Sequence, residues 1–255
     1  IGVRLVGSEM CIRDRPNTSF QIVAHRGLSQ KYPENTLEGF KAALMQHIDM
    51  LEIDVHFTKD KQLVVIHDDS IDRTSNQKGK VKDFTLEELK QFDFGIKHGE
   101  SFKNTCISTF SEVLSLFKKY SKTLLIEIKK PEQYPGIEKA LLEELDKFQI
   151  PSHRVVIQSF DVESVKKMSE YTKKYALGVL ISKKQYWYKQ PDYENIASFA
   201  QFINPNYKLI NKKFIKRAHE HHLKVIPYTV NNVKDVKKLI HLGVDGIISC
   251  LLYTS

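Results

Sequence analysis

Two acidic residues stand inside the strand-like run LEIDV, and a histidine ends the apolar run QLVVIH that follows it. Glu52 and Asp54 are separated by one residue, so their side chains point to the same face of a β-strand. A buried charge without a partner costs several kcal/mol, roughly the cost of a lost hydrogen bond or more. The positions of Glu52, Asp54 and His67 therefore predict a functional site within an otherwise apolar core.

Other polar residues follow or end strand-like runs in the same way. His25 and Arg26 come directly after FQIVA, and Glu127 and Lys129 alternate in LLIEIKK. Three inward carboxylates on adjacent strands repel one another unless they are neutralised, and a ligand set of oxygens favours a hard cation. The sequence predicts one divalent cation, Ca²⁺ or Mg²⁺, bound by Glu52, Asp54 and Glu127. The alternative is that Arg26 and Lys129 neutralise the acids as ion pairs without a metal.

The pair of histidines favours the metal site over ion pairs alone, because two histidines beside a metal can carry out acid–base catalysis. Imidazole is the side chain best matched to proton transfer near neutral pH, so His25 and His67 are the expected acid and base. One imidazole would deprotonate a nucleophile and the other would protonate a leaving alkoxide, while cations hold the non-bridging oxygens. Together these residue types indicate phosphoryl chemistry.

These residues can meet only if their strands are neighbours. Short β-rich runs alternate with amphipathic, helix-like runs, a pattern that predicts a (β/α)8 TIM barrel with its active site at the carboxyl ends of the strands. A doubly wound open sheet is the alternative. The expected strands are FQIVAH, MLEIDV, LLIEI, VVIQSF, ALGVLI, FINP, VIPYTV and GIIS.

One connection breaks this alternation. Only the residues HFTKDKQ separate the second strand from LVVIH, too few for a parallel crossover, so an antiparallel hairpin is expected. A turn centred on Asp60 and Lys61 would place Asp54 opposite His67. The polar segment 68–108 then forms a small insertion on the substrate side, with a helix that starts at the capping box of Thr85 and Glu88. A single barrel over residues 17–249 is expected.

Composition narrows the class of protein. The net charge is +8, but lysines are scattered along amphipathic runs, which indicates a solvated surface rather than a nucleic-acid footprint. No apolar run suits stable membrane insertion.

The three cysteines form no paired framework, so a reduced, cytoplasmic protein is expected. Residues 1–16 and 250–255 resemble translated vector sequence, and a signal peptide could therefore have been lost. The oligomeric state stays open.

Five stretches in order across about 20 to 249 resemble the glycerophosphodiester phosphodiesterase family. They are VAHRGLSQKYPENTLEGFKAAL, LEIDVHFTKDKQLVVIHDDSIDRTSNQKGKV, LLIEIK, VVIQSFD and VIPYTVN…GVDGIIS. The resemblance implies a barrel and a metal-dependent hydrolysis of glycerophosphodiesters, small-molecule substrates, to sn-glycerol 3-phosphate and an alcohol. It also implies attack by the glycerol 2-hydroxyl through a cyclic phosphate.

The resemblance also assigns roles residue by residue. It implies that His25 and His67 are the acid/base pair, that Arg26 contacts the phosphate and that Lys129 lies near it. Glu52, Asp54 and Glu127 would hold the metal. Phe160 and Tyr228 are expected either as apolar walls for the glycerol or as part of the barrel packing. Glu34 and Asn35 of the PENT stretch would shape the first loop and start the first helix, and a contact of Glu34 with the substrate is the alternative. The sequence departs from the family pattern at Tyr228, where Trp is frequent, and at Cys250, where an acidic residue is usual.

Two other functions stay open. A phosphatidylinositol-type phospholipase has a similar fold and also uses two histidines, but no separate lipid-docking element is visible in the sequence. A non-catalytic barrel that binds phosphodiesters is the second alternative, and the complete set of charged residues argues against it, because a retired site has no physical reason to keep buried charges.

Overall fold

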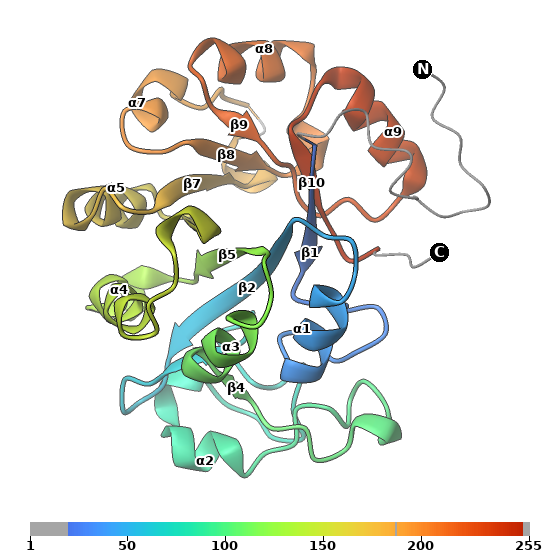
Figure 1. Ribbon diagram of the computed structural model, residues 1–255, viewed down its shortest axis with the longest axis vertical. Helices are drawn as coiled ribbons and strands as arrows, with labels where there is room; N and C mark the ends of the chain where they lie inside the picture. The colour runs from blue at the N-terminus through green and yellow to red at the C-terminus, as the bar shows by residue number, and fades with distance from the viewer. Residues whose placement is uncertain (1–19, 187, 252–255) are drawn as a thin grey trace.

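A computed structural model describes residues 20–186 and 188–251, and the parallel strands in this part of the chain form one curved sheet (Figure 1). The order across the sheet is β10-β1-β2-β5-β6-β7-β8-β9. All eight predicted strands are present at or near their predicted positions. They are β1 (Gln21–His25), β2 (Met50–Phe57), β5 (Thr123–Ile128), β6 (Val155–Ser159), β7 (Ala176–Ile181), β8 (Phe202–Pro205), β9 (Lys224–Val225) and β10 (Gly246–Ser249).

Backbone hydrogen bonds close this sheet into a barrel. The regular ladder stops at β9, but the Asp245 N–H donates to the Val225 carbonyl at 2.9 Å, and the Ile248 N–H donates to the Pro227 carbonyl at 2.9 Å. The (β/α)8 TIM barrel is thus confirmed, and the doubly wound alternative is wrong. Strand β9 is shorter than the predicted run at 225–230, because the Ile226 N–H donates to the Asn204 side chain at 3.2 Å rather than to a backbone carbonyl of β8.

The amphipathic runs form helices around the outside of the barrel (Figure 1). The inward and outward alternation of β2 is as predicted, since Leu51, Ile53 and Val55 pack in the core cluster shared with the helices. A short helix, α6, was not predicted. The helices are α1 (Leu37–Leu44), α3 (Phe110–Phe117), α4 (Ile137–Lys147), α5 (Val162–Tyr171), α6 (Lys183–Tyr186), α7 (Tyr193–Ala197), α8 (Lys212–Glu220) and α9 (Val233–Leu242).

A second apolar cluster fills the inside of the barrel below the polar residues. Its members come from nearly every strand, so the part of the barrel interior below the site is filled by apolar side chains. They are Val23, Met50, Leu125, Val156, Phe202, Ile226 and Ile248. Within the described residues, no helix is long and apolar enough to cross a membrane.

The predicted hairpin is present, but its register differs by one residue. Strand β3 (Leu63–Val65) pairs antiparallel with β2, and Val65 lies opposite Val55. The Ile66 N–H donates to the Asp54 carbonyl, so Asp54 faces Ile66 rather than His67. The reason is the turn, in which Lys61 adopts a left-handed φ of 56° and the Thr58 N–H donates to the Gln62 carbonyl.

The insertion is a packed lobe with a core of its own. Strand β4 (Ser108–Thr109) returns the chain beside β3, and α2 (Leu86–Lys90) starts at the predicted capping box of Thr85 and Glu88. The lobe lies beyond α1 and α3 in Figure 1. Its buried residues form a cluster separate from the barrel core, namely Val64, Ile66, Ile71, Val81, Leu89, Phe94 and Ile107.

Candidate active site

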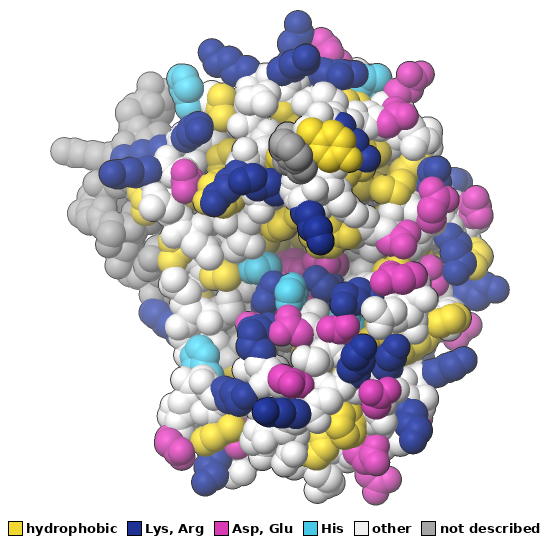
Figure 2. Space-filling model, turned by 180° about the vertical axis from the view of Figure 1, so that it is seen from behind, with side chains coloured by type: hydrophobic (Ala, Val, Ile, Leu, Met, Phe, Trp, Pro, Cys, Tyr) yellow, Lys and Arg dark blue, Asp and Glu magenta, His cyan; other side chains and the backbone are white. Residues whose placement is uncertain are grey.

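Three buried carboxylates gather at the carboxyl ends of β2 and β5. Asp54 and Glu127 are direct partners in the parallel register of these strands, and Glu52 precedes them by one inward position. The exposed fractions of Glu52, Asp54 and Glu127 are 1%, 0% and 6%. Each offers one oxygen, and these oxygens all lie within 4.8 Å of one another. Figure 2 shows a hollow on this side of the barrel, with histidine, acidic and basic side chains gathered in it.

The loop after β1 brings Arg26 against these acids. Arg26 has a left-handed φ of 59°, and its backbone N–H donates to Glu52 Oε2 at 3.0 Å. Its Nε lies 3.4 Å from Asp54 Oδ2. Gly27 also has a positive φ, of 87°, and a Cβ there would lie 2.8 Å from the Gly39 carbonyl carbon. The turn therefore requires glycine after Arg26, which explains the HRG sequence physically.

Lys129 is the second cation that faces the acids. Its Nζ lies 2.6 Å from Glu127 Oε1 and 3.5 Å from Asp54 Oδ1. The same ammonium lies 5.7 Å from the centre of the Phe160 ring, and the Phe160 and Tyr228 rings meet edge to face at 5.7 Å. The two predicted apolar walls thus lie together beside Lys129, although the Tyr228 hydroxyl is engaged, since it donates to the Ile181 carbonyl at 3.1 Å.

The two cations do not satisfy the three acids completely. Burial and the neighbouring Asp54 and Glu127 raise the pKa of Glu52 well above its ordinary value. Burial likewise raises the pKa of Glu127 to about 7 against the opposing effect of Lys129. Only the pKa of Asp54 is lowered, because Lys129 and Arg26 outweigh its burial.

The unsatisfied atoms of this cluster fit a metal ion. Asp54 Oδ1 and Glu127 Oε1 are buried, accept no well-directed hydrogen bond and share a single ammonium, that of Lys129, at 3.5 and 2.6 Å. Buried polar atoms without partners are rare in native proteins and call for an explanation, such as an ion. A set of three buried carboxylates that faces only two cationic side chains among the described residues suits a hard divalent cation. The cluster of Glu52, Asp54 and Glu127 is therefore able to hold one.

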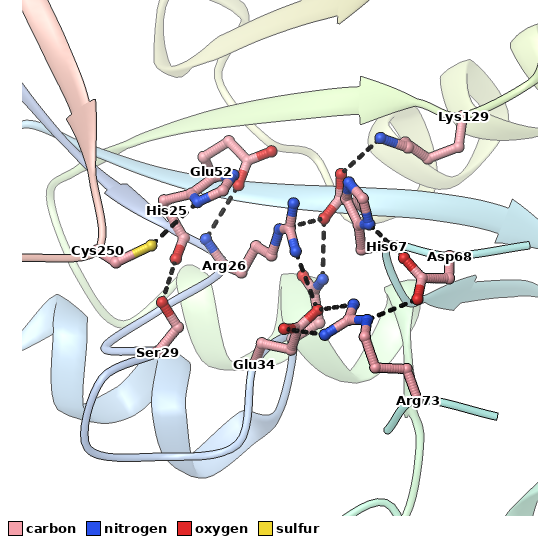
Figure 3. A network of polar contacts seen from close by, with 12 residues as sticks. His25, Arg26, Ser29, Glu34, Glu52, His67, Asp68, Arg73, Lys129 and Cys250 are labelled. Atoms are coloured by element: carbon pink, nitrogen blue, oxygen red, sulfur yellow. Dashed lines mark hydrogen bonds and ion pairs between the residues drawn. The ribbon is translucent and has the colours of Figure 1, made fainter. Parts of the chain in front are cut away.

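The two histidines flank the same mouth, each with a different neighbour (Figure 3). His67 Nδ1 lies 2.6 Å from Asp68 Oδ1, and His25 Nδ1 lies 3.2 Å from Cys250 Sγ. Burial lowers the pKa of both rings, that of His25 to about 3. His67 stays close enough to Asp54 to interact with its charge, although the hairpin register differs from the prediction, because the chain leaves the ladder after Val65 and bends.

The structure adds residues that the sequence analysis did not single out. Asp68 and Arg73, both from the insertion, contact His67 and Glu34 respectively. Asp68 directly follows a candidate catalytic histidine in the sequence, and this position could have identified it as a site residue. Asn35 of the PENT stretch also has a role in the site, because its Nδ2 donates to Asp54 Oδ2 at 2.9 Å.

A buried histidine supports His67 from behind. His56 Nε2 lies 3.1 Å from the His67 carbonyl, which can only accept, so this nitrogen carries the proton. His56 Nδ1 must then accept, and the Tyr134 hydroxyl, 2.9 Å away, donates to it. His56 thus has a structural role, because it holds the backbone of a site residue.

Comparison with known proteins identifies relatives along nearly the whole body of the chain. Residues 25–249 match the model of the glycerophosphoryl diester phosphodiesterase family. A glycerophosphodiester phosphodiesterase of Caldanaerobacter subterraneus is 39% identical over 232 residues, which cover 89% of this chain and 93% of the relative. A glycerophosphodiester phosphodiesterase of Bacillus altitudinis is 38% identical over 231 residues, with the same coverage.

Solved structures agree with the sequence relatives. A phosphodiesterase of Oleispira antarctica, in complex with the product sn-glycerol-3-phosphate, superposes with a TM-score of 0.82 and is 26% identical. The match covers 91% of this chain and 93% of that protein. A glycerophosphodiester phosphodiesterase of Thermotoga maritima is 25% identical with a TM-score of 0.73, over 92% of this chain and 96% of that protein.

Proposed function

The chain belongs to the glycerophosphoryl diester phosphodiesterase family of phosphoric diester hydrolases, and from this premise we propose that it hydrolyses glycerophosphodiesters to sn-glycerol 3-phosphate and an alcohol. One observation carries the proposal. Three buried carboxylates that need an additional cation lie between two histidines and two basic side chains at the mouth of a barrel. This set of groups matches the needs of phosphodiester hydrolysis, in which the substrate is anionic and the leaving group is an alkoxide.

The substrate phosphate is held by positive charge. Arg26 and Lys129 would bind its non-bridging oxygens, since both cations reach the mouth beside the acids. Glu52, Asp54 and Glu127 would hold one divalent cation, Ca²⁺ or Mg²⁺. When bound, that cation supplies positive charge that offsets the charge which builds up on the phosphoryl oxygens.

The two histidines move the protons. His25, whose pKa of about 3 keeps it neutral, would take the proton of the glycerol 2-hydroxyl as that oxygen forms a bond to phosphorus. The bond from phosphorus to the other alcohol breaks, and His67 would give a proton to the departing oxygen. Water then opens the cyclic phosphate as the two proton transfers reverse. As the donor, His67 must enter this step as the charged imidazolium, and the carboxylate of Asp68, 2.6 Å from its Nδ1, favours that charged form against the burial that lowers the pKa of the ring.

The apolar side of the mouth suits the glycerol. Phe160 and Tyr228 form a wall next to Lys129, so the carbon backbone of glycerol can lie against aromatic rings while its phosphate stays with the cations. This arrangement favours a small glycerophosphodiester as substrate.

An assay of product release tests the proposal. Purified protein is incubated with glycerophosphocholine or glycerophosphoethanolamine, and sn-glycerol 3-phosphate is measured before EDTA, after EDTA, and after Ca²⁺ or Mg²⁺ is returned. We expect activity that chelation removes and one of the two ions restores, and the restoring ion identifies the metal. Turnover that survives exhaustive chelation would refute the metal assignment, and no product from either substrate would refute the activity.

A further inference from the structure

A single arginine of the insertion joins the two sides of the site (Figure 3). Arg73 Nε donates to Asp68 Oδ2 at 2.7 Å, and its two terminal nitrogens donate to the two oxygens of Glu34, each at 2.7 Å. Asp68 contacts His67 with its other oxygen, and Glu34 accepts from Arg26 at 3.1 Å. Arg73 therefore connects the candidate proton donor to the candidate phosphate ligand.

We propose that Asp68 and Arg73 are positioning residues for the reaction, through which the insertion holds the His67 ring and the Arg26 guanidinium in their working orientations. The inference deepens the proposed function and rests on it, because it takes His67 as the proton donor. Neither residue touches the acids that would hold the metal, so their contribution is separate from metal binding.

The geometry of Asp68 leaves its carboxylate little freedom. One oxygen lies 2.6 Å from His67 Nδ1 and the other accepts from Arg73, so rotation of the carboxylate would break a charged hydrogen bond on either side. A carboxylate can only accept, so the His67 proton that faces it must lie on Nδ1. The neutral ring then presents an unprotonated Nε2 to the site, and the charged ring presents an Nε2 proton there.

The geometry of Arg73 explains why the anchor is an arginine. Its planar guanidinium binds Glu34 through two parallel hydrogen bonds and still has Nε available for Asp68. Lysine carries the same charge but cannot form this fork, so it could keep one partner and lose the other. Glu34 in turn limits the rotation of Arg26, whose NH1 it accepts from.

The next residue along the chain supplies a matched control. Asp69 pairs with Lys130 at 2.7 Å, the same distance as between Arg73 and Asp68. The exposures of the two pairs are nearly equal, 27% and 46% against 28% and 48%. The Asp69 carboxylate, however, forms no hydrogen bond or ion pair with His25, His67 or Arg26 within the described part of the chain. A purely structural effect of losing such an ion pair should therefore appear equally in Asp69→Asn.

Steady-state kinetics with saturating cation measure the effect. For Asp68→Asn we expect kcat to fall by about 10- to 100-fold with KM changed less than about threefold, since supporting groups of this kind contribute on this scale. Arg73→Gln should lower kcat by about 10-fold, and Arg73→Lys by less. The double variant Asp68→Asn/Arg73→Gln should be slowed by less than the product of the two single effects, because the two residues share one connection to His67 while Arg73 also acts on Arg26 through Glu34. Asp69→Asn should stay within about twofold of the unchanged protein.

A spectroscopic readout separates positioning from folding. Nitrogen NMR of histidine-labelled protein, assigned by comparison with His67→Ala, should place the neutral-ring proton of His67 on Nδ1. In Asp68→Asn it should move toward Nε2, which leaves that nitrogen without a lone pair to take the proton of water in the second step. Neither result depends on turnover.

The outcomes distinguish this inference from the proposed function. If His67→Ala loses turnover while Asp68→Asn and Arg73→Gln keep it, the positioning roles are refuted and the proposed function stands. If the unchanged protein releases no sn-glycerol 3-phosphate, the proposed function falls and the inference with it. If His67→Ala keeps full turnover, the role of His67 as proton donor and the inference both fall, while the hydrolysis itself stands. An equal loss in Asp69→Asn and Asp68→Asn would also refute the inference.

Discussion

The two halves of the barrel interior treat buried polar groups in opposite ways. On the side of β6 and β8, the buried amides of Gln158 and Asn204 form a hydrogen bond of 2.8 Å, and Asn204 Oδ1 accepts from the Ile226 N–H at 3.2 Å. On the side of β1, β2 and β5, the buried carboxylates of Asp54 and Glu127 keep oxygens that accept no well-directed hydrogen bond.

This difference separates a structural polar pair from a functional one. Neutral amides that satisfy each other cost little in the interior and fix a unique packing, whereas carboxylates with free oxygens destabilise the fold unless a ligand meets them. The barrel concentrates that cost in one half, where the mouth opens and a cation and a substrate phosphate can reach it. Four variants or conditions can sharpen or break this comparison, from the largest expected effect to the smallest.

His67→Ala tests the charged half most strongly. Loss of the proton donor should lower kcat by about 100- to 10,000-fold, since proton transfer contributes on this scale. Turnover of glycerophosphocholine measures the effect, and circular dichroism should show an unchanged fold, because the His67 side chain is 30% exposed and packs in no core cluster. Near-normal turnover in the folded variant would show that the charged half is not the reacting half.

Glu52→Gln tests whether the acids gain stability from a cation. With the cation at about 100 times its Kd, the free energy of unfolding should rise by about 2.7 kcal/mol in the unchanged protein, and Glu52→Gln should lose most of that gain. Denaturant unfolding with and without Ca²⁺ or Mg²⁺ measures it. The control is Glu138→Gln, which alters a 4% exposed acid that is already paired with Lys167 and Ser164. A full cation gain in Glu52→Gln would contradict the metal assignment.

Asn204→Ala tests the neutral half. It removes the partner of Gln158 and leaves the buried Ile226 N–H without an acceptor, which should lower the free energy of unfolding by about 1–3 kcal/mol. The kcat of the folded variant should stay within about twofold of the unchanged protein. A large fall in kcat without a loss of stability would mean that the amide pair takes part in the reaction and that the two halves are not distinct.

Acid should weaken the bridge between the insertion and the site, with a smaller effect. Burial opposes the charge of Asp68, but Arg73 and His67 outweigh it and lower its pKa from 3.8 to about 2. Because the pKa is lower in the folded protein, Asp68 stabilises the fold above pH 3.8 and this contribution disappears as the pH falls toward 2. Arg73 is 48% exposed, so solvent should limit the effect to about 1 kcal/mol or less. Urea unfolding at several pH values should show a weaker acid dependence in Asp68→Asn, and identical curves would contradict the prediction.

Local patterns in the sequence were enough to predict the barrel and the group of acids. The alternation in LEIDV fixes which side chains face inward, and the parallel register of β2 with β5 then brings Asp54 beside Glu127 without further information. The site roles of His25, Arg26 and Lys129 stay predictions, although these residues do meet at one mouth. The expectations on residues 1–16 and 252–255 lie outside the described residues.

Details that depend on turn geometry or on distant pairing could not be predicted in the same way. The hairpin register depends on the left-handed conformation of Lys61, and an error of one residue reverses which side chains face each other. The insertion has no helical or strand period long enough to indicate its separate core. The contact of Arg73 with Glu34 joins positions 39 residues apart through a folded lobe, and neither residue type signals it.

The closure of the barrel has a consequence for the order of events during protein synthesis. Gln21 of β1 pairs with Gly246 of β10, so β1 keeps one open edge until the final strand has left the ribosome. Every charged residue assigned to the site lies between His25 and Lys129, and all of them are made long before that. The strands that carry the acids, β2 and β5, are therefore both synthesised before the strand that closes the ring around them.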